Sequence, residues 1–255
     1  MAAGPFQPQV PPLRRAFALL LRHFGPQRWW PGDTPFEVCV GAILTQNTAW
    51  SNVEKAIANL RRARVMTPRC LRALPLRRLA SLIRPAGYFN VKARRLRSFL
   101  DFLHDEFRDD LRRMFRVPTT VLREKLLGVN GVGPETADSI LLYAGGHESF
   151  VVDAYTRRVL ARHGWIKPDA GYHEIKALFE RVLGARQTRT TIHRYPCALP
   201  TGHPPSGMSR RSLRHSPRAR LFNEDHALFV AVGKHCCAAR QAKCGQCPLK
   251  SLLPK

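Results

Sequence analysis

The chain has 255 residues, and its 42 Lys and Arg outnumber its 18 Asp and Glu, which gives a formal net charge of +24. This excess indicates a polyanionic partner, most simply DNA or RNA. No apolar run approaches the length of a membrane span, and residues 1–9 lack the pattern of a signal peptide. We therefore expect a protein of the cytoplasm or nucleoid, with enough apolar residues for one large or two modest cores.

The spacing of apolar residues predicts an all-helical chain without a convincing strand or an internal repeat. Pro75 should divide two short helices, because proline interrupts a helix. In chain order, helices are expected at 36–46, 51–60, 71–74, 76–83, 96–107, 119–127, 134–144, 154–162, 173–183 and 223–232.

The most informative stretch, residues 126–137, reads as helix, glycine hairpin, helix. We expect Thr119 or Thr120 to cap the first helix and Gly145 to end the second. Gly131 and Gly133 permit positive φ and a tight turn. Such a turn presents bare amides and a helix N-terminus to a phosphate, which predicts a nucleic-acid contact.

Asp153 follows the hairpin within the apolar stretch 150–152. It suits the N-cap of the helix expected at 154–162, which is a structural role. A lone carboxylate near a nucleic-acid backbone also suits chemistry there, and the two roles are compatible.

Residues 186–220 depart from the helical pattern, because they contain eight Arg, five Pro and no acid. This composition predicts disorder. Two interpretations remain open for the segment: a basic flap that wraps DNA, and an insertion or locally shifted reading frame.

The hairpin, Asp153 and the stretches 40–48 and 87–93, in this order, resemble the endonuclease III family of helix–hairpin–helix DNA glycosylases. The resemblance covers about residues 27–247, apart from the Arg/Pro segment. It implies two helical domains with DNA bound in the cleft between them. One is a six-helix barrel over 27–148 that includes the hairpin at 119–144, and the other combines 1–26 with 149–255.

The resemblance implies that Asp153 is the catalytic carboxylate of a DNA N-glycosylase in base excision repair. A fixed carboxylate stabilises the positive charge that develops on the sugar, and it can orient or deprotonate water. The target base must first leave the duplex stack.

Glu135 is the second residue that we assign to the catalytic region. Family members that also cut the strand carry a lysine at this position, and its amine forms a Schiff base. A carboxylate cannot do so, which predicts base removal by hydrolysis with weak or absent lyase activity. Glu135 also suits the first turn of a helix, where the helix dipole favours an acid. Lys125 could replace the missing lysine as nucleophile, but it lies before the hairpin, which disfavours this role.

Trp29, Trp30 and Trp50 lie near the expected base pocket. An electron-rich aromatic wall suits a flipped cationic alkylated purine, so the chain resembles the 3-methyladenine branch of the family. The alternatives are that these tryptophans are barrel core, or that the substrate is a mismatched or an oxidised base.

By resemblance, Gln46 fills the gap left by the extruded base and Tyr88 wedges into the duplex. Lys92 is expected to touch a phosphate, and a solvated helix face is the alternative for it. Gln46 could instead cap a buried turn, and Tyr88 could pack within a loop.

Cys237, Cys244 and Cys247 have the family spacing of a [4Fe-4S] cluster, but Leu253 stands where the fourth cysteine is expected. Cys236 is next to Cys237 and is poorly placed to serve as the missing fourth ligand. A cluster with a non-cysteine ligand, a labile cluster and a lost site all remain open.

The sequence thus predicts a monomeric, monofunctional DNA glycosylase that acts on double-stranded DNA containing a damaged base. One alternative is a non-catalytic helix–hairpin–helix DNA-binding protein. The other is a strand-cutting glycosylase for mismatched or oxidised bases.

Overall fold

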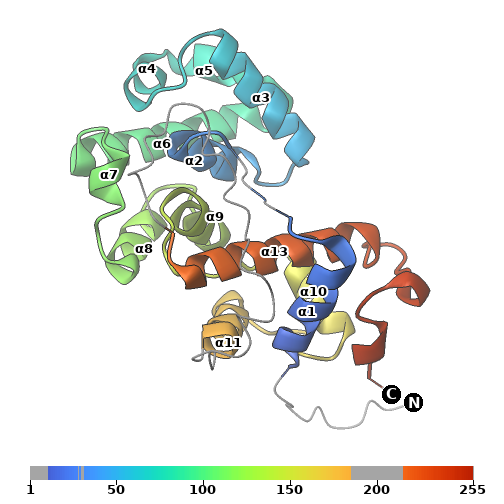
Figure 1. Ribbon diagram of the computed structural model, residues 1–255. Coiled ribbons are helices and arrows are strands. Elements are labelled where there is room, and N and C mark those ends of the chain that lie inside the picture. The colour runs from blue at the N-terminus through green and yellow to red at the C-terminus, as the bar shows by residue number, and fades with distance from the viewer. Residues whose placement is uncertain (1–10, 28, 30–31, 185–214, 255) are drawn as a thin grey trace. The chain divides into compact units, whose positions relative to one another are not determined.

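A computed structural model describes residues 11–27, 29, 32–184 and 215–254. It divides into two compact units, which we call the terminal unit (1–29, 150–202 and 217–255) and the central unit (30–149 and 203–216). Over the described ranges both units are helical and contain no named strand, so the predicted all-α class is confirmed (Figure 1). Within the same ranges, no helix combines the length and the apolar character that crossing a bilayer requires.

The central unit is built around α2, whose residues are almost all buried and which packs against α3, α6, α9 and the π-helix η2. Thr34 caps α2 by accepting a hydrogen bond from the Glu37 amide, and Pro35 occupies its first position, which proline favours. The elements of this unit are α2 (Pro35–Leu44), α3 (Trp50–Arg62), α4 (Pro68–Ala73), α5 (Leu76–Leu82), the 3-10 turn η1 (Arg84–Ala86), α6 (Phe89–Phe107), α7 (Leu111–Met114), α8 (Thr119–Leu127), α9 (Pro134–Ser139) and η2 (Ile140–Ala144).

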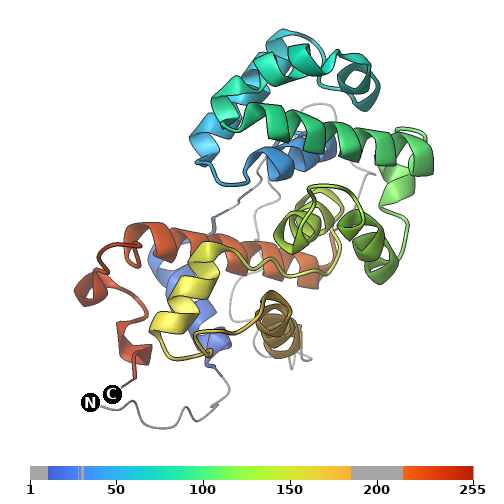
Figure 2. The same ribbon diagram turned by 180° about the vertical axis from the view of Figure 1, so that it is seen from behind.

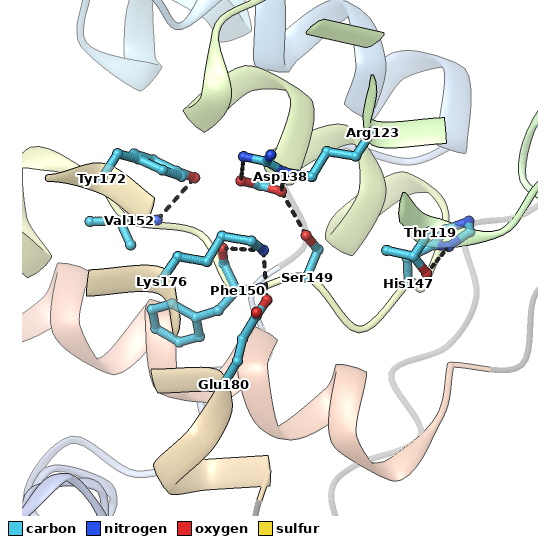
Figure 3. Close-up of polar contacts among 10 residues, drawn as sticks. All are labelled: Thr119, Arg123, Asp138, His147, Ser149, Phe150, Val152, Tyr172, Lys176 and Glu180. Atoms are coloured by element: carbon cyan, nitrogen blue, oxygen red, sulfur yellow. Dashed lines mark hydrogen bonds and ion pairs between the residues drawn. The ribbon is translucent and has the colours of Figure 1, made fainter. Parts of the chain in front are cut away.

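Two details of the predicted hairpin helices differ from the structure. The second helix changes from α to π geometry at Ile140. The predicted threonine cap is wrong, because α8 begins at Thr119 behind Pro118 and has no side-chain cap. The Thr119 hydroxyl instead pairs with Nδ1 of His147 at 2.9 Å (Figure 3), since that imidazole lies within reach.

The terminal unit is built around α13, which packs against α1, α10 and α11, as both views show for α1 and α10 (Figures 1 and 2). Phe150 stacks on Phe179 with 4.0 Å between ring centroids and meets Phe222 edge-on at 5.7 Å, which joins the segment 150–184 to α13. Its elements are α1 (Leu13–Phe24), α10 (Ala154–Arg162), α11 (Tyr172–Gly184), α13 (Pro217–His235) and the short turns η3 (Cys244–Gln246) and η4 (Lys250–Leu252).

The Arg/Pro segment predicted to be disordered falls mostly on residues 185–214, which lie outside the described residues. At its end the prediction is wrong, because α13 already begins at Pro217. Arg218 donates a hydrogen bond to the Gly184 carbonyl, and Ala219 is fully buried. The first turn of α13 was not predictable from the composition of the segment, because it is stabilised by these tertiary contacts.

A buried ion pair fastens the two hairpin helices together (Figure 3). Asp138 on α9 is fully buried and accepts two hydrogen bonds from Arg123 on α8, from Nε at 2.8 Å and from Nη2 at 3.0 Å. The Ser149 hydroxyl donates to the same carboxylate at 2.6 Å. A bidentate pair of this kind fixes the angle between the helices as well as their separation.

We expect Asp138→Ala to lower the free energy of unfolding by about 3–5 kcal/mol, because it leaves a largely buried guanidinium without its carboxylate. Urea denaturation measures this loss. Glu106→Gln is the matched control: it breaks the exposed Lys125–Glu106 pair, whose N–O distance is 2.7 Å, and should cost less than about 1 kcal/mol. Equal losses in the two variants would contradict the structural role of Asp138.

Helix α13 carries four consecutive polar residues, 223–226, that are all buried. Glu224 accepts a hydrogen bond from the Gln27 amide at 2.6 Å. Asp225 is fully buried, and within the described part of the chain neither of its carboxyl oxygens has a hydrogen-bond partner. Burial, together with the nearby Glu224 charge, raises the pKa of Asp225 well above its ordinary value of 3.8.

The raised pKa of Asp225 makes stability depend on pH. The unfolded chain releases this proton near pH 3.8, whereas the folded chain retains it to a higher pH. The folded state therefore binds more protons between the two pKa values, and the free energy of unfolding falls as pH rises through that window.

Ionising the buried Asp225 carboxyl lowers the free energy of unfolding, and Asp225→Asn removes this loss. We therefore expect the variant to raise the thermal midpoint near neutral pH, by about 2–4 °C for each kcal/mol regained. The gain should shrink as pH falls toward the ordinary carboxyl pKa, which calorimetry over a pH series measures. Asp169→Asn, at an exposed turn of the same unit, is the control and should leave the midpoint unchanged. A lower midpoint for Asp225→Asn at neutral pH would show that the fold requires the charged carboxylate.

Candidate active site

Asp153 stands at the point where a buried, extended apolar stretch meets α10. Its Oδ1 accepts a hydrogen bond from the Thr156 amide at 2.7 Å, so the predicted N-cap is confirmed. The side chain is 13% exposed, so the carboxylate is held in place while solvent still reaches it.

The second oxygen of this carboxylate faces a histidine that sequence reasoning missed. Nε2 of His226 on α13 lies 3.7 Å from Oδ2 of Asp153. Trp29 stacks on the imidazole with 5.5 Å between centroids and 14° between planes. Burial lowers the pKa of His226, although the Asp153 charge opposes the shift. The imidazole is therefore neutral near neutral pH and leaves the charge of the carboxylate uncompensated.

The hairpin uses its two glycines differently from the prediction. Gly131 has φ of 85°, and a Cβ there would overlap side-chain carbons of Arg95, so only glycine fits. Gly133 is extended, with φ −89° and ψ 178°, and serves as the N-cap of α9, so of the two glycines only Gly131 uses the positive φ that glycine permits. Among the described residues, the amides of both glycines donate no hydrogen bond, which leaves them available to an anion.

Gln46 is attached to the hairpin. Its Nε2 donates to the Gly131 carbonyl at 2.9 Å and to Oγ1 of Thr136 at 3.0 Å, and Arg95 donates to its Oε1. The side chain therefore holds the hairpin in this structure. Gln46 would have to release these bonds before it could fill a gap in a duplex.

Tyr88 and Glu135 both lie on the surface of the central unit. Tyr88 is 73% exposed and adopts a left-handed backbone, with φ of 43°, immediately before α6. Glu135 is exposed in the first turn of α9, where the helix dipole favours an acid. Both positions are accessible to a large ligand.

Lys92 differs from both expectations, because it lies neither on a solvated face nor on a phosphate-binding surface. It is 1% exposed, and its Nζ donates to the carbonyls of Leu44 at 2.9 Å and Ala86 at 2.6 Å. Burial and the Arg95 charge lower its pKa. Lys92 therefore ties the C-terminal end of α2 to η1 and is not available to DNA in this structure.

Trp50 lines a cavity of about 190 Å³ in the central unit, together with Gly32, Asp33, Glu37, Glu54, Ile57, Ala58 and Arg61. Arg61 neutralises much of the acidity there, because it pairs with Asp33 and with Glu37, the latter at 2.7 Å. Trp29 belongs to the terminal unit instead, next to His226. Trp30 lies outside the described residues.

The C-terminal cysteines do not fit a four-thiolate cluster as they lie in the structure. Over the described ranges, no three His, Cys, Asp or Glu side chains are grouped to hold a metal ion. The thiol of Cys236 forms a hydrogen bond with Cys247, and Arg162 donates to Sγ of Cys237 at 3.4 Å. Burial raises the pKa of Cys247 to about 11.

Comparison with known proteins places these features in a family. Residues 40–184 match the family described as the HhH-GPD superfamily base excision DNA repair protein. A candidate DNA repair glycosylase of Methanocaldococcus jannaschii is 40% identical over 238 residues, which cover 92% of this chain and 93% of the relative.

Solved structures agree with this assignment. The 3-methyladenine DNA glycosylase of H. pylori, bound to 1,N6-ethenoadenine, is 27% identical with a TM-score of 0.68, and the match covers 87% of this chain and 96% of that one. An endonuclease III trapped as a covalent DNA intermediate has the same fold, with a TM-score of 0.70 at 21% identity over 94% of this chain and 93% of that one. The chain belongs to the HhH-GPD superfamily of base excision DNA repair proteins.

Proposed function

We propose that this base excision repair DNA glycosylase removes an alkylated purine from duplex DNA by hydrolysis, without cutting the strand. The observation that carries the proposal is the Asp153 carboxylate, which a backbone amide fixes and a neutral imidazole flanks.

The chemistry follows from this carboxylate. Once the base is extruded, the bond between the base and the sugar carbon C1′ breaks, and its electron pair leaves with the base. The sugar becomes positively charged, and the Asp153 carboxylate stabilises that charge electrostatically. A water molecule then attacks C1′ and gives its proton to the carboxylate, which acts as a general base.

The fixed orientation of Asp153 suits this role. Because Oδ1 is committed to the Thr156 amide, the carboxylate cannot rotate freely, and Oδ2 keeps one direction. A protonated histidine beside it would weaken its stabilisation of the sugar cation, but burial keeps His226 neutral. The environment thus preserves the negative charge that the reaction uses.

The lysines placed by the structure support hydrolysis over Schiff-base chemistry. Position 135 in the hairpin is glutamate, which has no amine. Nζ of Lys125 pairs with Glu106 at 2.7 Å, and Nζ of Lys92 is buried between carbonyls. None of these groups presents a free amine to a sugar carbon.

The alkylated-purine assignment is supported by aromatic surface and by similarity. Trp29 stacks on His226, the imidazole that faces Asp153, and so adds a large indole to this cluster. An electron-rich ring attracts a cationic alkylated base. The similar H. pylori enzyme is named a 3-methyladenine glycosylase and was solved with 1,N6-ethenoadenine.

DNA binding is assigned to the hairpin. The amides of Gly131 and Gly133, with the N-terminus of α9 behind them, make a suitable site for a backbone phosphate. The anchoring of the hairpin by Gln46 and by the Arg123–Asp138 pair keeps this site rigid.

We expect Asp153→Asn to slow single-turnover base release by about 10²–10³-fold, because it removes the charge that stabilises the transition state while keeping an oxygen for the N-cap. The measurement uses separate duplexes that carry a methylated purine, an oxidised base, or a mismatched uracil or thymine. Asp169→Asn, an exposed acid of the same unit, should release base at the wild-type rate.

The same panel decides between the alternatives. Release from the oxidised or mismatched duplexes alone would overturn the substrate assignment. Wild-type protein that binds every duplex and releases no base would identify a non-catalytic DNA-binding protein.

We expect borohydride to trap no covalent adduct between the wild-type protein and its substrate duplex, because position 135 carries a carboxylate instead of an amine. Glu135→Lys should create a trappable adduct, visible as a shifted band on a denaturing gel, whereas Glu135→Gln should not. A wild-type adduct would contradict the hydrolytic mechanism and indicate a lyase.

A further inference from the structure

The positive charge of this protein is concentrated in two segments. Residues 55–100 contain thirteen Lys and Arg and no Asp or Glu. The following residues, 101–184, are nearly balanced, with twelve Lys and Arg against thirteen Asp and Glu. The second basic segment, 186–220, lies mostly outside the described residues, so the structure bears on the first.

Residues 55–100 form a continuous part of the central unit, which we call the arginine layer. It runs from the first turns of α3 through α4, α5 and η1 to the middle of α6. Helices α4 and α5 pack on α6, and α3 packs on α5 and η1, so the segment folds as one body (Figures 1 and 2).

Most cations of the arginine layer have no internal counter-charge. Some cations have contacts within the fold: Arg61 pairs with acids, Arg95 holds Gln46, and Lys92 is buried. Arg62 and Arg97 donate hydrogen bonds to Asn59 and to the Leu74 carbonyl, and Arg84 lies over the Phe89 ring. Six others are exposed and form no ion pair within the described ranges: Lys55, Arg64, Arg69, Arg77, Arg78 and Arg94. Like charges that are gathered without acids repel one another, which destabilises the fold unless a polyanion binds.

The arginine layer is continuous with the phosphate-binding hairpin. Arg95 packs its side-chain carbons against Gly131, and Gln46 links the same arginine to the Gly131 carbonyl. Tyr88, the most exposed large apolar residue of the layer, lies between η1 and α6. The hairpin and the acid-free segment 55–100 thus belong to the same unit and are in contact at Arg95.

We propose that the arginine layer binds the phosphate backbone of duplex DNA beyond the damaged nucleotide. Guanidinium groups suit phosphate because they donate two parallel hydrogen bonds to it. Such contacts carry no sequence information, and they supply affinity for undamaged DNA that depends on salt. The proposal rests on the proposed function only for the identity of the partner, DNA.

The test measures binding to a long duplex without a lesion by fluorescence anisotropy over a series of salt concentrations. The variant Arg69→Gln/Arg77→Gln/Arg78→Gln removes three unpaired cations of the layer. Log affinity falls with log salt, so the slope is negative. For this variant the magnitude of the slope should be smaller than for the wild type by about 2–3, because each phosphate contact contributes about 0.9.

The matched control is Arg112→Gln/Arg116→Gln/Arg181→Gln, which removes the same charge from exposed positions outside the layer. Its slope should change by less than about 0.5. Equal changes in both variants, or no change in the layer variant, would overturn the proposal. Circular dichroism checks folding, and the single variants Arg69→Gln and Arg78→Gln repeat the test if the triple variant unfolds.

This measurement is independent of catalysis, because the duplex contains no damaged base. Wild-type protein that releases no base would overturn the proposed function, while the salt slopes would still decide whether the layer binds DNA. A normal rate of base release with an unchanged slope in the layer variant would leave the proposed function intact and reject the layer.

Discussion

The hydrogen bond from the Thr156 amide to Asp153 is the interaction on which the candidate active site depends. It ends the extended stretch after the hairpin, begins α10, and points one carboxylate oxygen in a fixed direction. A cap of this kind stabilises a helix by about 1 kcal/mol, so structure alone accounts for it. The same geometry fixes a charged group without a flexible linker, which is what electrostatic catalysis requires.

The Asp153 carboxylate has a fixed orientation, and its neighbour on α13 is a buried ionisable side chain. His226 and Asp225 are adjacent on α13, and burial shifts the pKa of each toward its neutral form. His226 is neutral near neutral pH, so it does not pair as a cation with the Asp153 carboxylate. Burying ionisable groups lowers stability, so a buried ionisable group in contact with Asp153 supports the proposal that this carboxylate is part of a functional site.

Local signals in the sequence were enough for the fold class and for part of the site. Apolar spacing located most of the helices but missed α1 and α7. Pro75 separated α4 from α5, and the position of Asp153 before an expected helix gave its cap. Contacts between distant segments were not predictable. Lys92 sits among other basic residues and looks solvated, yet it is buried against two carbonyls. His226 was missed because only the packing of α13 against α10 brings it to Asp153.

The hairpin and the arginine layer solve different parts of one physical problem. In the proposed complex, two amides and a helix N-terminus bind a single phosphate at a defined place, but they provide little long-range attraction, because partial charges act over a short distance. The full charges of the arginine layer would attract a duplex from about a Debye length away, and salt would weaken that attraction. Since Arg95 touches Gly131 and holds Gln46, the two surfaces meet at one residue. Arg95 on α6 would therefore place a duplex bound to the layer next to the hairpin.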